Sequence, residues 1–109
     1  MSRQLSKPEE IILLSIWRLG SEAYGVSILR HVNQMTGREW SIGAIYAPLH
    51  RLQKKGLVRT ERGEPLPERG GRSRVYYELT PKGNKALVEA QQMYESLWTG
   101  FPSVPFESE

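Results

Sequence analysis

Apolar residues follow helical spacing in four stretches of the chain, and two short stretches between the third and the fourth are typical of strands. The first stretch predicts a helix over residues 7–19. Ser6 and Glu9 have the spacing of a capping box at its start, and Gly20 is expected to end it. Because more than one face of this segment is apolar, we expect the helix to be buried on two sides.

Two further helices are predicted with only a tight turn between them. The second opens at Tyr24 and ends near residues 36–37. The third runs over residues 41–55, with Ser41 as its N-cap and Gly56 directly after its end. Trp40 can pack on this helix as a hydrophobic staple. Two helices joined in this way predict a helix-turn-helix.

A hairpin and one more helix follow the helix-turn-helix. Residues 57–62 and 73–79 predict two strands, and GEPLPERGGR between them, with three glycines and two prolines, predicts an irregular tip, or wing. Residues 80–81, Thr-Pro, start a last helix that reaches about residue 98, and residues 100–109 are expected to form a loose tail.

These elements together predict a mainly α fold with a two-stranded wing, a winged helix-turn-helix with a long C-terminal helix. We expect the DNA-binding part to occupy residues 1–80 and a dimerisation helix to occupy residues 81–99 of the same compact unit.

Composition is consistent with one small soluble domain. The chain has 109 residues, of which 39% are hydrophobic, and it has no cysteine. A disulfide framework and a thiolate metal site are therefore excluded. No apolar run approaches the length of a membrane span or a signal sequence, so we expect a cytoplasmic protein without membrane contact.

Charge is unevenly distributed along the chain. Residues 50–85 contain ten Lys or Arg against four Glu, whereas the remainder contains five against eight. A basic middle with acidic flanks indicates either a surface that faces phosphates or an ordinary solvated face. Charge alone does not separate the two interpretations.

The predicted third helix carries small residues first and longer polar or basic residues later, on the side opposite its apolar stripe. A helix that enters the major groove must bring its N-terminal turns close to base edges, so this order predicts DNA contacts. The residues concerned are Ser41, Gly43, Ala44, Tyr46, His50, Arg51 and Lys54. For Ala44, close packing on the second helix is an equal explanation. For Tyr46 we expect the ring to lie against the second helix and the hydroxyl to face a phosphate.

Pro48 lies in the middle of this helix, where a proline removes a backbone donor and costs about 3 kcal/mol. We expect one continuous helix that bends at Pro48 and so adjusts how its first half enters the groove. The alternative is a pair of short helices.

Three stretches of the chain resemble the PadR-like family of transcriptional regulators, in its shorter branch. They are Tyr24-Gly25-Val26, GAIYAPLHRLQKKGLV at residues 43–58 and GGRSRVYYELTPKG at residues 70–83. Relatives commonly have a proline directly after the tyrosine of the second stretch, whereas here it is one place later. The resemblance implies a homodimeric DNA-binding regulator, usually a repressor, that often responds to a small molecule. It places DNA contacts at Tyr24, Ser41, Gly43, Tyr46, His50, Lys54, Arg72 and Arg74.

Other classes of function fit less well. The two histidines, His31 and His50, lie on separate predicted helices without an acidic partner at helical spacing, and the chain has no Asp. We therefore expect neither enzyme activity nor a cofactor, and we expect His31 to be a surface or helix-packing residue. A winged helix that contacts proteins instead of DNA is the alternative, and Glu61, Glu64 and Glu68 on the hairpin favour it.

Apolar residues of the first and last helices predict a homodimer. The last helix is longer than the domain beneath it, and its distal half has no element of its own chain to cover it. The expected interface residues are Ile12, Ile16, Trp17, Leu87, Ala90, Met93, Tyr94, Leu97 and Trp98. Trp17, Trp40, Tyr94 and Trp98 also form a possible stacking surface for a small aromatic effector, although core or interface packing is the simpler reason for them.

Overall fold

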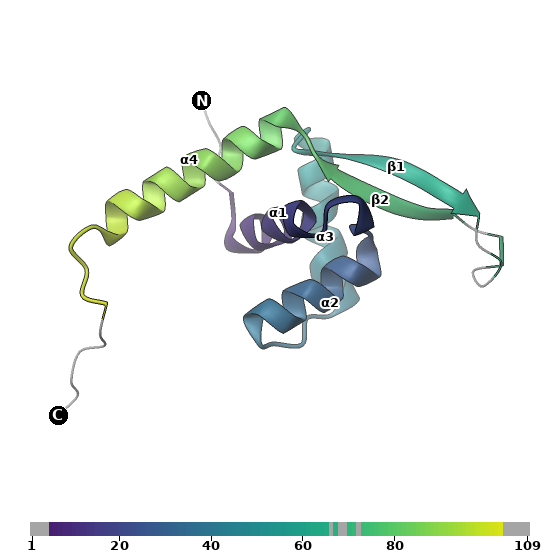
Figure 1. Ribbon diagram of the computed structural model, residues 1–109, viewed down its shortest axis with the longest axis horizontal. Coiled ribbons are helices and arrows are strands. Elements are labelled where there is room, and N and C mark those ends of the chain that lie inside the picture. Colours follow the sequence, from purple (N-terminus) through teal and green to yellow (C-terminus); the bar gives the residue numbers. More distant parts are fainter. Residues whose placement is uncertain (1–4, 66, 68–69, 72, 104–109) are drawn as a thin grey trace.

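The fold is a winged helix-turn-helix, as predicted. The structure is a computed structural model that describes residues 5–65, 67, 70–71 and 73–103. Its elements in chain order are α1 (Lys7–Leu19), the 3₁₀ turn η1 (Gly20–Glu22), α2 (Gly25–Thr36), α3 (Ile42–Lys54), β1 (Val58–Pro65), β2 (Ser73–Leu79) and α4 (Pro81–Trp98). Figure 1 shows α1, α2 and α3 gathered in one body, with the hairpin projecting to one side and α4 to the other.

Local capping explains the helix starts. Ser6 Oγ accepts a hydrogen bond from the Glu9 N–H at 3.2 Å, and Glu9 Oε1 accepts from the Ser6 N–H at 2.9 Å. The predicted capping box is therefore confirmed. Ser41 Oγ accepts from the Ala44 N–H at 3.1 Å and caps α3 in the same manner.

Pro48 lies inside a single α-helix. Helix α3 runs from Ile42 to Lys54 without a break, so the continuous helix is confirmed and the pair of short helices is wrong. The Pro48 ring is buried beside Leu49, and this apolar burial offsets part of the cost of the missing backbone donor.

Residues from α1, α2, α3, the start of β1 and the short connections before α2 and β1 form the hydrophobic core. Its buried members are Ile12, Leu13, Ile16, Ala23, Ile28, Val32, Ile45, Leu49, Leu52, Leu57 and Val58. The expectation that Ile12 and Ile16 present apolar surface to a partner is wrong, because both side chains are covered by their own chain. The exposed apolar residues of α1 are Leu14 and Trp17.

The hairpin is longer than predicted on its first strand. Antiparallel pairing with β2 continues past Arg62 to Pro65 through a register shift, so the irregular tip begins later than Gly63. Gly63 is required within the strand, because a Cβ there would lie 2.6 Å from Cε2 of the Tyr76 ring. The rest of the predicted tip contains residues 66, 68, 69 and 72, which lie outside the described residues.

The hairpin is joined to the start of α2. The Tyr77 N–H donates to the Ala23 carbonyl at 2.8 Å, and Tyr24 forms an isolated antiparallel bridge with Tyr76. These bonds fix the base of the wing against the helix-turn-helix.

The Thr-Pro-Lys-Gly segment at residues 80–83 fixes α4 to the corner between α3 and β1. Thr80 Oγ donates to the Gly56 carbonyl at 2.7 Å and accepts from the Gly83 N–H at 3.0 Å. The Lys82 ammonium donates to the Lys55 carbonyl at 2.9 Å, at the C-terminal end of α3 where a cation is favoured. A Cβ at Gly83 would overlap the Leu57 carbonyl oxygen, so the close approach needs glycine.

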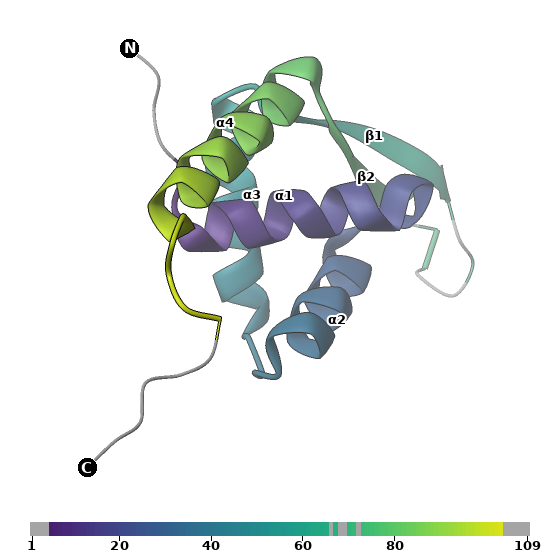
Figure 2. The ribbon, with the colours of Figure 1, turned by 60° about the vertical axis from the view of Figure 1, so that its left-hand side comes forward.

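Most of α4 is exposed. Gly83 is its one buried residue, and Leu97 and Trp98 at its distal end are 70% and 61% exposed. Figure 2 shows α4 running down to the N-terminal end of α1, where the Lys7 ammonium lies 3.9 Å from the centroid of the Tyr94 ring. Helix α4 ends at Trp98 as predicted, and residues 104–109 of the predicted tail lie outside the described residues.

Candidate nucleic-acid interface

The outward face of α3 gathers most of the predicted contact residues. Ser41, Gly43, Ala44, Tyr46, His50, Arg51 and Lys54 are all exposed. A Cβ at Gly43 would meet only Ser41 Oγ, at 3.9 Å, so the space beside the first turn is open. Because Ala44 is exposed, close packing on α2 is not the reason for its small size. The first turns of α3 can therefore approach a surface closely.

Tyr46 lies between α3 and α2. A Cβ at Gly25, the first residue of α2, would collide with the Tyr46 hydroxyl. Tyr46 therefore lies against α2 as expected, but it is the hydroxyl end of the side chain that lies nearest to the start of that helix. The Tyr46 ring is still 46% exposed and contributes to the face of α3. Burial of Tyr77, together with the nearby Tyr46, raises the pKa of the Tyr77 phenol. Tyr77 therefore keeps its proton at neutral pH and remains a hydrogen-bond donor.

Two basic residues at the end of α3 are held by a buried carboxylate on α1. Glu9 is 2% exposed, and its Oε2 accepts from Lys55 Nζ at 2.9 Å and from Arg51 Nε at 3.3 Å. Arg51 is thus directed toward α1, although half of its side chain is exposed. Lys54 forms no ion pair with the described residues.

The pKa of Glu9 reflects this environment. Burial of the carboxyl raises its pKa, but several other interactions lower it by more. They are the hydrogen bonds from Lys55, the Ser6 backbone and Arg51, and the charge of Lys55. The net result is a pKa below the ordinary value, so Glu9 is ionised at neutral pH.

The base of the wing brings Tyr24 and Arg74 together. The Arg74 guanidinium lies over the Tyr24 ring at 4.2 Å from its centroid, and Tyr24 meets the Tyr76 ring edge-on at 5.7 Å. Two predicted contact residues from distant parts of the chain therefore share one cluster. Arg72, the other predicted contact on the wing, lies outside the described residues.

Sequence reasoning missed a hollow beside α3. It has a volume of about 520 Å³ and is lined by Tyr46, Ala47, His50, Arg51, Gln53, Lys54 and Tyr77. Tyr77 comes from β2, which places one side of the hollow on the wing. Side chains alternate along residues 73–79, so Tyr76 and Tyr77 lie on opposite faces of the strand. This alternation is the feature of the sequence from which the position of Tyr77 could have been predicted.

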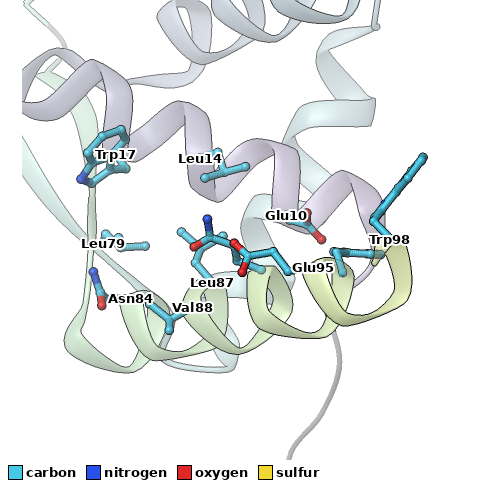
Figure 3. Close-up of a pocket in the computed structure, with 11 residues that line it drawn as sticks. Glu10, Leu14, Trp17, Leu79, Asn84, Leu87, Val88, Glu95 and Trp98 are labelled. Carbon is cyan, nitrogen blue, oxygen red and sulfur yellow. The ribbon is translucent and has the colours of Figure 1, made fainter. Parts of the chain in front are cut away.

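A second, mostly apolar groove lies between α1 and α4. It has a volume of about 700 Å³ and is lined by Glu10, Leu14, Trp17, Leu79, Asn84, Leu87, Val88, Gln91, Tyr94, Glu95 and Trp98. Figure 3 shows Leu14 and Trp17 pointing from α1 toward α4, with Trp98 at the far end of α4. Glu10 Oε2 is buried here without a hydrogen-bond partner among the described residues.

The four aromatic residues considered for an effector do not form one group. Trp17, Tyr94 and Trp98 line the groove between α1 and α4, whereas Trp40 packs against the core near the α2–α3 turn. The backbone N–H of Trp40 donates to Asn33 Oδ1 at 2.7 Å, and this bond stabilises the turn between α2 and α3. Trp40 is therefore not part of this groove.

The two histidines have different surroundings. His31 Nδ1 lies 2.8 Å from Ser15 Oγ, which confirms the expectation that His31 is a helix-packing residue, whereas His50 is exposed on α3. Within the described parts of the chain, no three His, Asp or Glu side chains form a group that could hold a metal ion.

No helix among the described residues has the length and apolar character needed to span a membrane.

Comparison with known proteins identifies a family and several solved structures of similar fold. The model of the transcriptional regulator PadR-like family matches residues 12–89. No curated protein matches the chain.

Solved structures similar to this chain come from several organisms. A transcriptional regulator from Clostridium thermocellum has 26% identity and a TM-score of 0.69, with 84% of this chain and 85% of that chain covered. A PadR-like transcriptional regulator from Bacillus cereus has 30% identity and a TM-score of 0.66, with 84% of each chain covered. RosR from H. salinarum has 29% identity and a TM-score of 0.66, with 94% of this chain and 84% of that chain covered.

Proposed function

Because this chain belongs to the PadR-like family of transcriptional regulators, we propose that it acts in the cytoplasm as a homodimeric repressor that binds a pseudo-palindromic operator. The observation that carries this proposal is the exposed face of α3, where Gly43, Tyr46, His50 and Lys54 lie together. Family membership places the chain among DNA-binding regulators of transcription, and we propose that it has no enzyme activity.

The order of residues along α3 suits the major groove. Ser41, Gly43 and Ala44 leave room for the first turns to reach base edges, and His50 and Lys54 follow about two and three turns later. Phosphate contacts orient the helix and base contacts select the sequence. The Tyr24–Arg74 cluster extends the contact surface to the base of the wing.

A protein-binding winged helix is the alternative function. Glu61 and Glu64 are exposed on the hairpin. Arg59 also pairs there with Glu78 at 2.6 Å, and this pair neutralises part of the positive charge of the hairpin. DNA is favoured because the α3 face carries Lys54 and His50 without a carboxylate partner among the described residues.

Selection of genomic fragments followed by footprinting tests the proposed operator. The expected result is a protected site with two half-sites related by a two-fold axis and separated by about 34 Å, one turn of the duplex. A site without internal symmetry would contradict the dimeric mode of binding, and no enrichment of any fragment would contradict sequence-specific binding.

Lys54→Ala is expected to weaken binding to all duplex sequences and to reduce the salt dependence. Loss of one phosphate contact from each protomer lowers the slope of log K against log salt by about 0.9 per contact, which is about 1.8 for the dimer. Lys85→Ala is the matched control, because it removes the same charge from α4, outside the α3 face. Equal slopes for Lys54→Ala and the wild type would remove Lys54 from the interface.

Exposed apolar residues of α4 support the homodimer. Leu97 and Trp98 are 70% and 61% exposed, and Leu14 and Trp17 of α1 are exposed on the neighbouring helix. A helix of 18 residues spans about 27 Å, so its distal half extends beyond the body of the domain. Two-fold packing of α4 on its own copy and on α1 of the partner would cover these residues and set the spacing of the two α3 helices.

Leu97→Glu is expected to convert the dimer to a monomer, because a charge would be buried in the interface. Sedimentation at micromolar concentration measures the change. Met35→Glu on α2 is the control, since Met35 is a similarly exposed apolar residue outside α4. A wild-type protein that sediments as a monomer would contradict both the dimer and the symmetric operator.

We also propose that a small planar aromatic compound releases the repressor by binding in the groove between α1 and α4. Trp17, Tyr94 and Trp98 provide stacking surfaces, and a donor on the compound would satisfy the buried Glu10 Oε2. A panel of such compounds should quench tryptophan fluorescence in the wild type and in Trp40→Phe, but much less in Trp98→Phe. Absence of quenching across the panel would indicate that these aromatic residues only pack.

A further inference from the structure

We propose that the hollow between α3 and β2 receives one backbone phosphate of the bound duplex, and that Tyr77 is a ligand of this phosphate together with His50 and Lys54. This inference rests on the proposed DNA binding. It adds a contact residue from the wing strand that neither the sequence pattern nor the resemblance identified.

The lining of the hollow is suited to an anion. Its polar side chains are Tyr46, His50, Arg51, Gln53, Lys54 and Tyr77, all of which can donate a hydrogen bond. No carboxylate of the described residues lines it. His50 and Lys54 are four residues apart on one face of α3, so both side chains reach the same space, and Ala47, about one turn before His50, is small.

The place of the hollow fits the path of the DNA backbone. With α3 in the major groove, the sugar–phosphate strand at the edge of that groove lies beside the helix. The hairpin leaves the body of the protein next to α3. The DNA strand at the edge of the groove must therefore cross the junction between α3 and β2. The hollow lies at that junction, because its lining combines α3 residues with Tyr77 of β2.

Tyr77 is held in position before any ligand binds. Its backbone N–H donates to the Ala23 carbonyl at 2.8 Å, and the residue pairs with Thr60 across the hairpin. The ring is half-buried and packs against the core. A side chain held in this way loses little conformational freedom on binding.

Tyr77 and Lys54 should contribute differently to the salt dependence of DNA binding. The phenol of Tyr77 is neutral, and its raised pKa keeps it protonated, so it donates a hydrogen bond without displacing a counterion. Lys54 is charged and contributes to counterion release. Loss of the Tyr77 hydroxyl should therefore lower affinity and leave the salt dependence unchanged.

Tyr77→Phe removes only the hydroxyl and is the first test. On duplex DNA we expect about tenfold weaker binding for each protomer, and so about 100-fold for the dimer, with the wild-type slope, as for loss of one hydrogen bond to a charged acceptor in each half-site. Lys54→Ala should instead lower the slope by about 0.9 for each protomer, which is about 1.8 for the dimer. Lys85→Ala on α4 is again the control and should bind like the wild type, and thermal unfolding of each variant checks the fold.

Neutral methylphosphonate groups, placed singly along the selected operator, locate the phosphate. One position in each half-site should weaken binding of the wild type, and should weaken binding of Lys54→Ala and of Tyr77→Phe by less. Wild-type affinity for Tyr77→Phe would overturn the inference, as would additive losses with both variants at every position. Failure of the wild type to bind any duplex would instead overturn the proposed DNA binding itself.

Discussion

Gly83→Ala is expected to destabilise the protein by about 3 kcal/mol, near the upper end of the cost of overpacking. A Cβ at this position would overlap the Leu57 carbonyl oxygen, which is backbone and already accepts from the Thr80 N–H at 3.1 Å. The start of α4 would have to move away from the corner between α3 and β1. Thermal or urea unfolding measures the loss, which corresponds to a decrease in Tm of roughly 15 °C.

Gly43→Ala is the matched control for Gly83→Ala. Gly43 lies inside α3, and a methyl group added there would meet only Ser41 Oγ, at 3.9 Å. The same substitution should therefore stabilise the protein by about 0.5–1 kcal/mol, since alanine favours the helix. A similar effect of both substitutions would contradict the close contact at Gly83.

Glu9→Gln is expected to destabilise the protein by about 2 kcal/mol at neutral pH. The buried carboxylate of Glu9 accepts from Lys55, Arg51 and the Ser6 N–H, and hydrogen bonds to a charged group contribute more than neutral ones. Glutamine keeps the size of the side chain but loses the charge. Denaturant unfolding of both proteins gives the difference in free energy.

The effect of Glu9 depends on pH. The pKa of Glu9 is lower in the folded protein than its ordinary value of 4.5, so its contribution is fully present above pH 4.5 and is lost as the pH falls through the folded pKa. The wild type and Glu9→Gln should therefore converge in stability in acid. Glu78→Gln is the control, because the pair with Arg59 is largely exposed and contributes little. A difference that stays constant down to about pH 3, where an ordinary carboxyl is protonated, would contradict the assigned ionisation of Glu9.

Helix boundaries could be predicted because their causes are local. Ser6, Ser41 and Thr80 each cap a helix within three residues, and the caps are visible in the sequence as spacings. The Thr-x-x-Gly motif could be recognised too, but its purpose could not. Its partners, Gly56 and Leu57, are known only when the corner between α3 and β1 is seen.

Other features depend on contacts between distant residues. Glu9 lies 42 and 46 residues before Arg51 and Lys55, so the sequence alone presents Arg51 as one more basic residue of the outward face. The sequence pattern shows that Ile12 and Ile16 belong to the apolar faces of the first helix. It does not show that their own chain covers them, or that Leu14 and Trp17 stay exposed. In each case the missing information is which face meets which neighbour.

The salt dependence of duplex binding by the wild-type protein tests the central claim most directly. The account predicts that log K falls linearly with log salt, with a slope of about 0.9 for each phosphate contact made by the α3 faces and the wings. Lys54 contributes one such contact from each protomer. A flat response, or no binding to duplex DNA at low salt, would contradict DNA binding and favour a winged helix that contacts another protein.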